Sequence, residues 1–137
     1  MSVQNDYRRG RHSVTRLVVH LIFTTKYRRK VFDGRMIGQL REAFDSACEK
    51  LECRIIEFDG EEDHVHLLVE YPPKMAISVL VNNLKSTSSR QIRFLNVDLP
   101  RLSKSSALWS RSYFAFSAGG ATIETLKAYV NGQKTPE

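Results

Sequence analysis

The chain has 137 residues, of which 42% are apolar and 26% are charged. This length suits one domain with its own hydrophobic core, and the composition excludes disordered and fibrous classes. No apolar run is long enough to span a bilayer, and the first six residues lack the apolar stretch of a signal peptide, so we expect a cytoplasmic protein. The two cysteines, Cys48 and Cys53, are too few for a disulfide framework and are expected to be free, half-buried thiols.

The net charge is +6 and the isoelectric point is near 9.5, which favours a polyanionic partner because a basic surface releases counterions from phosphates. Two clusters contribute to this charge. One comprises Arg8, Arg9 and Arg11, and the other is the block Lys26, Tyr27, Arg28, Arg29 and Lys30. Either cluster alone could be a solvated surface, but the tyrosine in the second offers a ring on which a nucleic-acid base can stack.

In chain order, the first predicted element is a strand at 15–25, where the residues are β-branched and apolar, as in a central strand covered on both faces. From Gly34 the apolar residues recur at steps of three and four, which predicts an amphipathic helix. Its apolar positions are Ile37, Leu40, Phe44, Ala47 and Leu51.

A β-hairpin is predicted next. Residues 53–58 form its first strand, 59–63 form a charged turn, and 64–71 form its second strand, which Pro72 and Pro73 end.

The second half of the chain contains three further predicted elements. A second helix runs over about 75–95, although its middle, 85–90, is rich in hydroxyl groups. Residues 109–116 are aromatic and alternating, which predicts a fourth strand. The glycines at 119–120 end that strand, and a short helix is expected over about 122–133.

The resulting order, β-α-β-β-α-β followed by a helix, matches the ferredoxin-like split βαβ arrangement. We therefore predict one α+β domain over 1–137 with a four-stranded antiparallel sheet, a basic N-terminal arm at 1–13 and an extra C-terminal helix at 121–135. Both main helices should cover one face of the sheet, and the other face stays open unless the last helix, a ligand or a second subunit covers it. Because this fold hosts many functions, function has to be argued from the site.

His64 and His66 are two residues apart on a predicted strand, so their side chains project from the same face, opposite Val65, Leu67 and Val69. The backbone spacing of about 7 Å lets suitable rotamers close both imidazoles onto one divalent ion. Imidazole suits Mn, Fe, Ni, Cu or Zn better than Mg, so ligand type alone does not identify the metal. An isolated His-x-His is a weak signal, and two structural histidines are the alternative.

Tyr129 and Gln133 are four residues apart on the last predicted helix and share one of its faces. The amide oxygen of Gln133 is an acceptable third metal ligand, which leaves positions for phosphate oxygens. Tyrosine has an unperturbed pKa of about 10, but it acts as a nucleophile when it is activated and positioned. Gly132 lies inside this turn and should weaken the helix by about 1 kcal/mol relative to alanine.

Three motifs follow one another along the chain. They are Lys26-Tyr-Arg-Arg-Lys30, Asp63-His-Val-His-Leu-Leu-Val69 followed by Pro72-Pro73, and Tyr129-Val-Asn-Gly-Gln133. Together they resemble the single-tyrosine HUH transposases of the insertion-sequence 200/605 family, whose last motif is Tyr-x-x-x-Gln. The resemblance extends from about Val18 to Gln133, and the ordered set is far more specific than any single motif.

The resemblance implies a homodimeric DNA transposase that acts on single-stranded DNA, recognises subterminal hairpins and uses a divalent metal, Mg²⁺ or Mn²⁺. It implies that Tyr129 attacks a phosphodiester to give a 5′-phosphotyrosine and a free 3′-hydroxyl, which later reverses the reaction at a new junction. It also makes His64, His66 and Gln133 the metal ligands. In this family the tyrosine helix can complete the active site of the partner subunit, and the glycines at 119–120 could be the hinge for that exchange.

Other residues admit competing interpretations. Tyr113 is a second conceivable nucleophile, but its aromatic strand indicates either the core or a base-stacking surface, and the core is favoured. His20 should border the metal face, where a buried structural histidine is favoured over a ligand. Glu61, Glu62 and Asp63 are interpreted as a charged turn without a catalytic role.

Lys85, Ser89 and Arg90 on the second predicted helix could form an ordinary polar face, but the family resemblance favours contact with DNA. One rival function is a non-catalytic protein that binds hairpin DNA or RNA on the same fold. Another is a metal-binding regulatory domain without affinity for DNA. The binding protein would tolerate Tyr129→Phe, whereas the enzyme would lose strand cleavage and keep hairpin binding.

Overall fold

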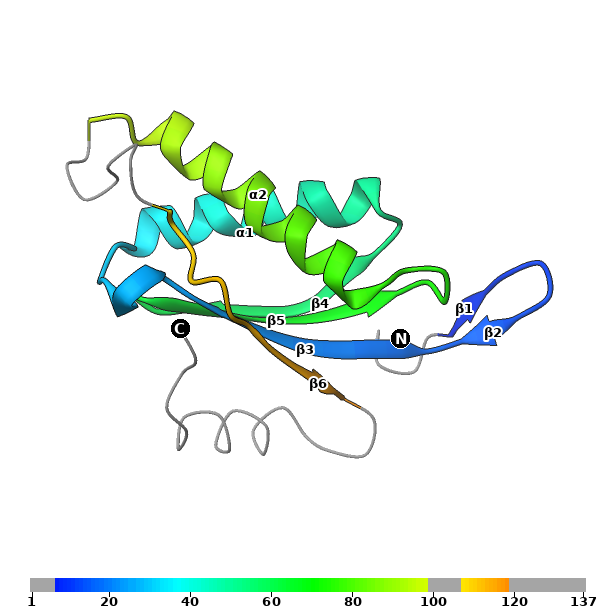
Figure 1. Ribbon diagram of the computed structural model, residues 1–137. Coiled ribbons are helices and arrows are strands. Elements are labelled where there is room, and N and C mark those ends of the chain that lie inside the picture. Colours follow the sequence, from blue (N-terminus) through cyan, green and yellow to red (C-terminus); the bar gives the residue numbers. More distant parts are fainter. Residues whose placement is uncertain (1–6, 99–106, 119–137) are drawn as a thin grey trace.

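The computed structural model describes residues 7–98 and 107–118. A four-stranded antiparallel sheet carries two helices on one face, and a small hairpin extends beyond the sheet (Figure 1). The main elements are β3 (Leu17–Thr24), α1 (Gly34–Lys50), β4 (Arg54–Gly60), β5 (His64–Tyr71), α2 (Ile77–Leu95) and β6 (Phe114–Ser117). The hairpin consists of β1 (Arg8–Arg9) and β2 (Val14–Thr15), and a 3-10 turn covers Lys26–Arg28.

The strand order in the sheet is β4-β5-β3-β6, and each neighbouring pair is antiparallel. β3 and β4 therefore run parallel to each other with β5 between them, and β5 and β6 run parallel with β3 between them. Two interleaved βαβ units of this kind make the ferredoxin-like arrangement, so the predicted α+β fold is confirmed. The extra helix predicted at 121–135 lies outside the described residues.

Alternation along the central strands divides their side chains between the two faces of the sheet. Val65, Leu67 and Val69 are buried in the core beneath the helices, as predicted. We call the opposite face the histidine face. By strand register, its side chains from β3 and β5 are Val18, His20, Ile22, Thr24, His64, His66, Leu68 and Glu70.

Both helices turn an apolar stripe towards the sheet. α1 begins after Asp33, whose side chain accepts a hydrogen bond from the backbone amide of Met36 at 2.9 Å and so caps the helix. In α2 the hydroxyl-rich middle has a structural use, because the buried Ser88 hydroxyl donates to the carbonyl of Leu84 and accepts from the indole Nε1 of Trp109 at 3.0 Å. Neither helix combines the length and apolarity that crossing a membrane requires.

Trp109 explains why the fourth strand is shorter than predicted. Its indole packs in the core against Phe23 and Phe32, with ring centroids 5.8 and 5.4 Å away, and its backbone makes only an isolated bridge with Thr25. β6 therefore begins at Phe114 rather than at Trp109. An aromatic residue in an alternating pattern can thus belong to the core without belonging to the strand.

Two smaller expectations also need correction. β4 continues to Gly60, so the turn of the hairpin shortens to 61–63. Cys48 and Cys53 are free, as predicted, but they are buried rather than half-buried. Burial raises the pKa of Cys48 to about 12 and that of Cys53 to about 11, so neither thiol is ionised near neutral pH.

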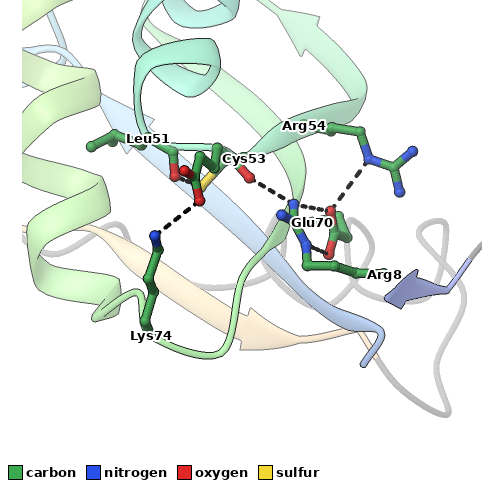
Figure 2. Close-up of polar contacts among 7 residues, drawn as sticks. Arg8, Leu51, Cys53, Arg54, Glu70 and Lys74 are labelled. Carbon is green, nitrogen blue, oxygen red and sulfur yellow. Dashed lines mark hydrogen bonds and ion pairs between the residues drawn. The ribbon is translucent and has the colours of Figure 1, made fainter. Parts of the chain in front are cut away.

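An ion pair connects the N-terminal hairpin to the C-terminal end of β5, which lies away from the histidines. Arg8 donates from Nε and Nη2 to the two carboxylate oxygens of Glu70, at 2.7 and 2.6 Å. Arg54 donates to the same carboxylate at 3.3 Å, and Figure 2 shows both guanidinium groups converging on it. This anchored hairpin was not foreseen for the basic arm, where the sequence pattern indicated charge but no strands.

Candidate functional site

His64 and His66 lie side by side on the histidine face, as the period of the strand predicts. Their ring centroids are 5.0 Å apart, and their planes meet at 68°. The side chain of His64 is 19% exposed, and His66 is 6% exposed. Both line a pocket of about 330 Å³. The pair is therefore reachable from solvent and is not enclosed in the apolar core.

The pocket is acidic despite the basic character of the whole chain. Besides the two histidines, its lining consists of Lys30 and four carboxylates, namely Asp59, Glu61, Glu62 and Asp63. Such a lining attracts a cation and repels a bare phosphate. A phosphodiester can therefore approach the histidines most favourably together with a cation.

Asp63 connects the histidine pair to the basic block. Its Oδ1 lies 2.8 Å from His64 Nδ1, and its Oδ2 accepts from Nε of Arg28 at 3.1 Å. Burial acts to raise the pKa of Asp63, but the hydrogen bonds and charges of His64 and Arg28 outweigh it and hold the pKa below the ordinary value of 3.8. The carboxylate is thus ionised at neutral pH.

The basic block at 26–30 is held against the turn that precedes His64 by backbone hydrogen bonds. The amide of the buried Thr25 donates to the carbonyl of Asp63 at 2.9 Å, and the amides of Val31 and Phe32 both donate to the carbonyl of Glu62 at 3.0 Å. Lys30 reaches the pocket itself. Cationic side chains therefore stand at the rim of an acidic cavity.

Tyr27 and Arg28 have an unusual backbone within this block. Their φ angles are 61° and 55°, in the left-handed region that residues other than glycine seldom adopt. The ring of Tyr27 is 70% exposed, with Lys26 Nζ 5.3 Å from its centroid. The ring is therefore accessible on the surface and does not pack into the core. Arg29 instead donates to the carbonyls of Lys26 and Ala107.

The histidine pair supplies two of the ligands that a divalent ion needs. Within 7–98 and 107–118, no group of three or more His, Cys, Asp or Glu side chains is arranged to hold a metal ion. Two adjacent imidazoles that face an acidic pocket fit a cation with an incomplete ligand set. Tyr129 and Gln133, predicted as nucleophile and third ligand, lie outside the described residues.

The remaining predicted residues lie in several environments. His20 is buried, as favoured, with its ring centroid 5.7 Å from that of His66. Tyr113 is 37% exposed, so its expected place in the core was wrong. The ring stands over Lys85 Nζ at 5.6 Å, beside the start of β6.

Lys85 is engaged with the protein itself. Its Nζ donates to the carbonyls of Ser110, Arg111 and Ser112 at 2.6, 3.3 and 3.1 Å, and burial lowers its pKa to about 8. This ammonium holds the segment that leads into β6. Arg90 is exposed, and Ser89 accepts a hydrogen bond from Arg93 at 3.4 Å.

Sequence reasoning gave no role to the acidic lining of the pocket, in which Asp63 and Asp59 lie beside the histidines. Asp63 was interpreted as part of a charged turn, although its position directly before the His-x-His pair is a signal that it could contact an imidazole. Asp59 lies opposite His66 in the register of β4 and β5, and so reaches the same pocket. That cross-strand pairing depends on the irregular register between Ile55 and Glu57, which the sequence does not reveal.

The fold and the site define a class of small α+β proteins that carry a His-x-His pair on the face of a ferredoxin-like sheet opposite the helices. The chain belongs to the IS200-like transposase family, whose model, described as "Transposase IS200 like", matches residues 13–133. The resemblance stated from the motifs is confirmed.

Known relatives agree with this assignment. The chain is 32% identical over 114 residues to the transposase for insertion sequence element IS200 of Salmonella typhimurium, covering 83% of this chain and 74% of the relative. It is 28% identical over 132 residues to the ISDra2 transposase TnpA of Deinococcus radiodurans, covering 96% and 94%.

Solved structures show the same architecture. A crystal structure of a Deinococcus radiodurans R1 protein assigned as a transposase is similar with a TM-score of 0.76 and 26% identity, covering 94% of this chain and 99% of the other. A REP-associated tyrosine transposase bound to a REP hairpin is similar with a TM-score of 0.58, covering 93% and 68%, and at 13% identity this likeness concerns the fold alone.

Proposed function

We propose that this chain cleaves and rejoins single-stranded DNA at insertion-sequence ends, with Tyr129 as the nucleophile. His64, His66 and Gln133 would hold a divalent ion, Mg²⁺ or Mn²⁺. The observation that carries the proposal is the histidine pair opening into an acidic pocket beside a basic block. Support also comes from the family match, which spans Tyr129 and Gln133.

The chemistry follows from the residues assembled at the pocket. A bound cation would neutralise charge on the scissile phosphate and orient it. The phenol oxygen of Tyr129 would form a bond to phosphorus while the bond to the 3′-oxygen breaks, and the phenol proton would leave as the 3′-hydroxyl forms. In the reverse step, a 3′-hydroxyl attacks the 5′-phosphotyrosine and releases the phenol. The energy of the phosphodiester is conserved in the intermediate, so no external energy source is needed.

DNA recognition is assigned to the cationic surface next to the pocket. The block Lys26, Tyr27, Arg28, Arg29 and Lys30 offers charges for the backbone and an exposed ring for a base. We assign a supporting DNA contact to Ser89 and Arg90 on α2. Lys85, whose ammonium binds the carbonyls of residues 110–112, would support it by holding the segment that leads into β6. The proposed substrate is a hairpin, like the REP hairpin to which the REP-associated transposase of the same fold is bound.

The assembly proposed for this activity is a homodimer. The described helices cover only one face of the sheet (Figure 1), and the other face carries the histidines. A tyrosine helix at 121–135, delivered from the same or the partner subunit, would complete the site there. We propose that residues 1–137 form a single transposase domain, which includes the basic arm at 1–13.

The deciding experiment looks for a covalent adduct. The chain is incubated with single-stranded element ends and Mg²⁺ or Mn²⁺, and denaturing electrophoresis then separates free from protein-linked DNA. The native chain should form an adduct, Tyr129→Phe should form none while keeping hairpin binding, and Tyr113→Phe should behave as the native chain. Hairpin binding without an adduct from the native chain would support the non-catalytic alternative instead.

A further inference from the structure

We propose that Asp63 is a positioning residue that orients His64 for cation binding, and that Arg28 in turn holds the carboxylate of Asp63. The inference rests on the proposed function, because it concerns how one of the proposed metal ligands is presented. It adds a residue to the site and links the basic block to the histidine pair.

The first step concerns the proton on His64. An ionised carboxylate only accepts hydrogen bonds, and Oδ1 of Asp63 lies 2.8 Å from His64 Nδ1. The ring must therefore carry its proton on Nδ1. A neutral imidazole protonated there has its lone pair on Nε2, which is the form that can bind a cation. A carboxylate partner of this kind fixes both the tautomer and the ring plane of a ligating histidine.

The second step concerns the carboxylate itself. Its other oxygen, Oδ2, accepts a hydrogen bond from Nε of Arg28 at 3.1 Å, and Nη2 of the same guanidinium lies 3.1 Å from it in an ion pair. The two oxygens of Asp63 thus have separate partners, one on the strand of the histidines and one in the basic block. Because its two oxygens contact His64 and Arg28, we assign Asp63 the role of a positioning residue that connects them.

The third step concerns the backbone. The carbonyl of Asp63 accepts from the amide of Thr25 at 2.9 Å and from its hydroxyl at 3.3 Å, and Thr25 is fully buried. Asp63 is therefore fixed at both its main chain and its side chain. Arg28 reaches it from a left-handed backbone, with φ of 55°, a conformation that places strain at a functional position.

One consequence is a physical link between DNA contact and ligand geometry. The same guanidinium that is proposed to meet a phosphate also holds the carboxylate that orients His64. DNA that binds Arg28 can thus change the orientation of His64 through two contacts, from Arg28 to Asp63 and from Asp63 to His64, without movement of the sheet.

The first test measures the tautomer of His64 in the full chain, without metal or DNA, from the nitrogen chemical shifts of its imidazole. The native chain should show the proton on Nδ1. Asp63→Asn, which is nearly isosteric and neutral, should give a mixture of tautomers or a shift towards protonation on Nε2. A native chain with the proton on Nε2 would overturn the proposal.

The second test measures Mn²⁺ affinity by titration calorimetry. Asp63→Asn should weaken binding about 10- to 100-fold, the usual effect of losing such a partner of a metal ligand. Glu61→Gln removes the same charge from an exposed position in the same pocket and should weaken binding by less than about fivefold. Equal losses of Mn²⁺ affinity in the two variants would mean that Asp63 acts only through its charge, and would contradict the positioning role.

The two tests separate this inference from the proposed function. A native chain that binds no Mn²⁺ and forms no DNA adduct would refute the metal site, and the tautomer measurement would still decide whether Asp63 orients His64. Adduct formation by the native chain together with unchanged Mn²⁺ affinity in Asp63→Asn would leave the enzyme intact and reject the positioning residue. Circular dichroism of each variant confirms that the fold is retained, and Asp63→Ala provides a second substitution.

Discussion

The carboxylate of Glu70, whose side chain is 1% exposed, receives two hydrogen bonds from the guanidinium of Arg8, a residue 62 positions earlier in the chain (Figure 2). Arg8 lies on β1 and Glu70 lies near the end of β5, so this pair connects the N-terminal hairpin to the central sheet. Ionised groups that are this deeply buried need partners, because the loss of hydration has to be offset.

Removing Arg8 should therefore cost more stability than removing Arg54. Arg8 makes two hydrogen bonds to Glu70 and is 24% exposed, whereas Arg54 makes one at 3.3 Å and is 46% exposed. We expect Arg8→Ala to lower the free energy of unfolding by about 2–3 kcal/mol and Arg54→Ala by less than about 1 kcal/mol. Urea unfolding measures both, and the reverse order would show that Arg54 is the main counterion.

The same pair predicts a dependence of stability on pH. Burial acts to raise the pKa of Glu70, but the hydrogen bonds and charges of Arg8 and Arg54 outweigh it and place the pKa below the ordinary value of 4.5. A carboxylate with a lowered pKa contributes stability that is complete above about 4.5 and is lost as the pH falls through the folded-state pKa. The advantage of the native chain over Glu70→Gln should shrink between pH 5 and pH 3, on the order of the window in which such a group titrates. An advantage that stays constant with pH would contradict this.

Ser88 offers a test of the core. Its hydroxyl is buried and accepts from Trp109 Nε1, so Ser88→Ala leaves a buried indole donor without that partner. We expect a loss of about 1–3 kcal/mol in the free energy of unfolding. Ser86→Ala, on the exposed side of the same helix, is the matched control and should change stability by less than about 0.5 kcal/mol. Alanine has a higher helix propensity than serine, so a similar loss in both variants would not come from propensity and would contradict a specific role of the contact with Trp109.

The periodic parts of the fold could be predicted from the sequence, because apolar spacing reports directly which side of an element is buried. That reasoning placed His64 and His66 on the same face and Val65, Leu67 and Val69 on the other. It could not find the pairing of Arg8 with Glu70, because this depends on side-chain direction across distant segments. The contact between Asp63 and the adjacent His64 was missed for another reason, because periodicity does not tell which way a side chain in a turn points. Trp109 was misplaced for a related reason, since alternation does not distinguish a strand from an irregular segment that packs into the core.

Replacing Tyr27 should affect the stability of the fold and the binding of DNA in different ways. Its φ of 61° suits glycine, so Tyr27→Gly should be more stable than Tyr27→Ala by about 1 kcal/mol. Both variants lose the exposed ring and should bind a single-stranded hairpin more weakly, by about 1–3 kcal/mol if one base stacks there. Thermal unfolding and fluorescence anisotropy measure the two effects. Hairpin affinity that is unchanged in both variants would remove Tyr27 from the binding surface.

The last prediction distinguishes a cation that acts at the pocket from one that holds the fold together. The sheet and core that carry His64 and His66 are built from backbone pairing and apolar packing, so a chelator should leave Tm unchanged. Excess Mn²⁺ should raise Tm, because a ligand bound only by the folded chain adds about 2.7 kcal/mol at a concentration 100 times its Kd. His64→Ala should abolish this rise, whereas His12→Ala, which removes an exposed imidazole from the turn of the N-terminal hairpin, should retain it. A rise that survives in His64→Ala would mean that the ion binds elsewhere on the chain.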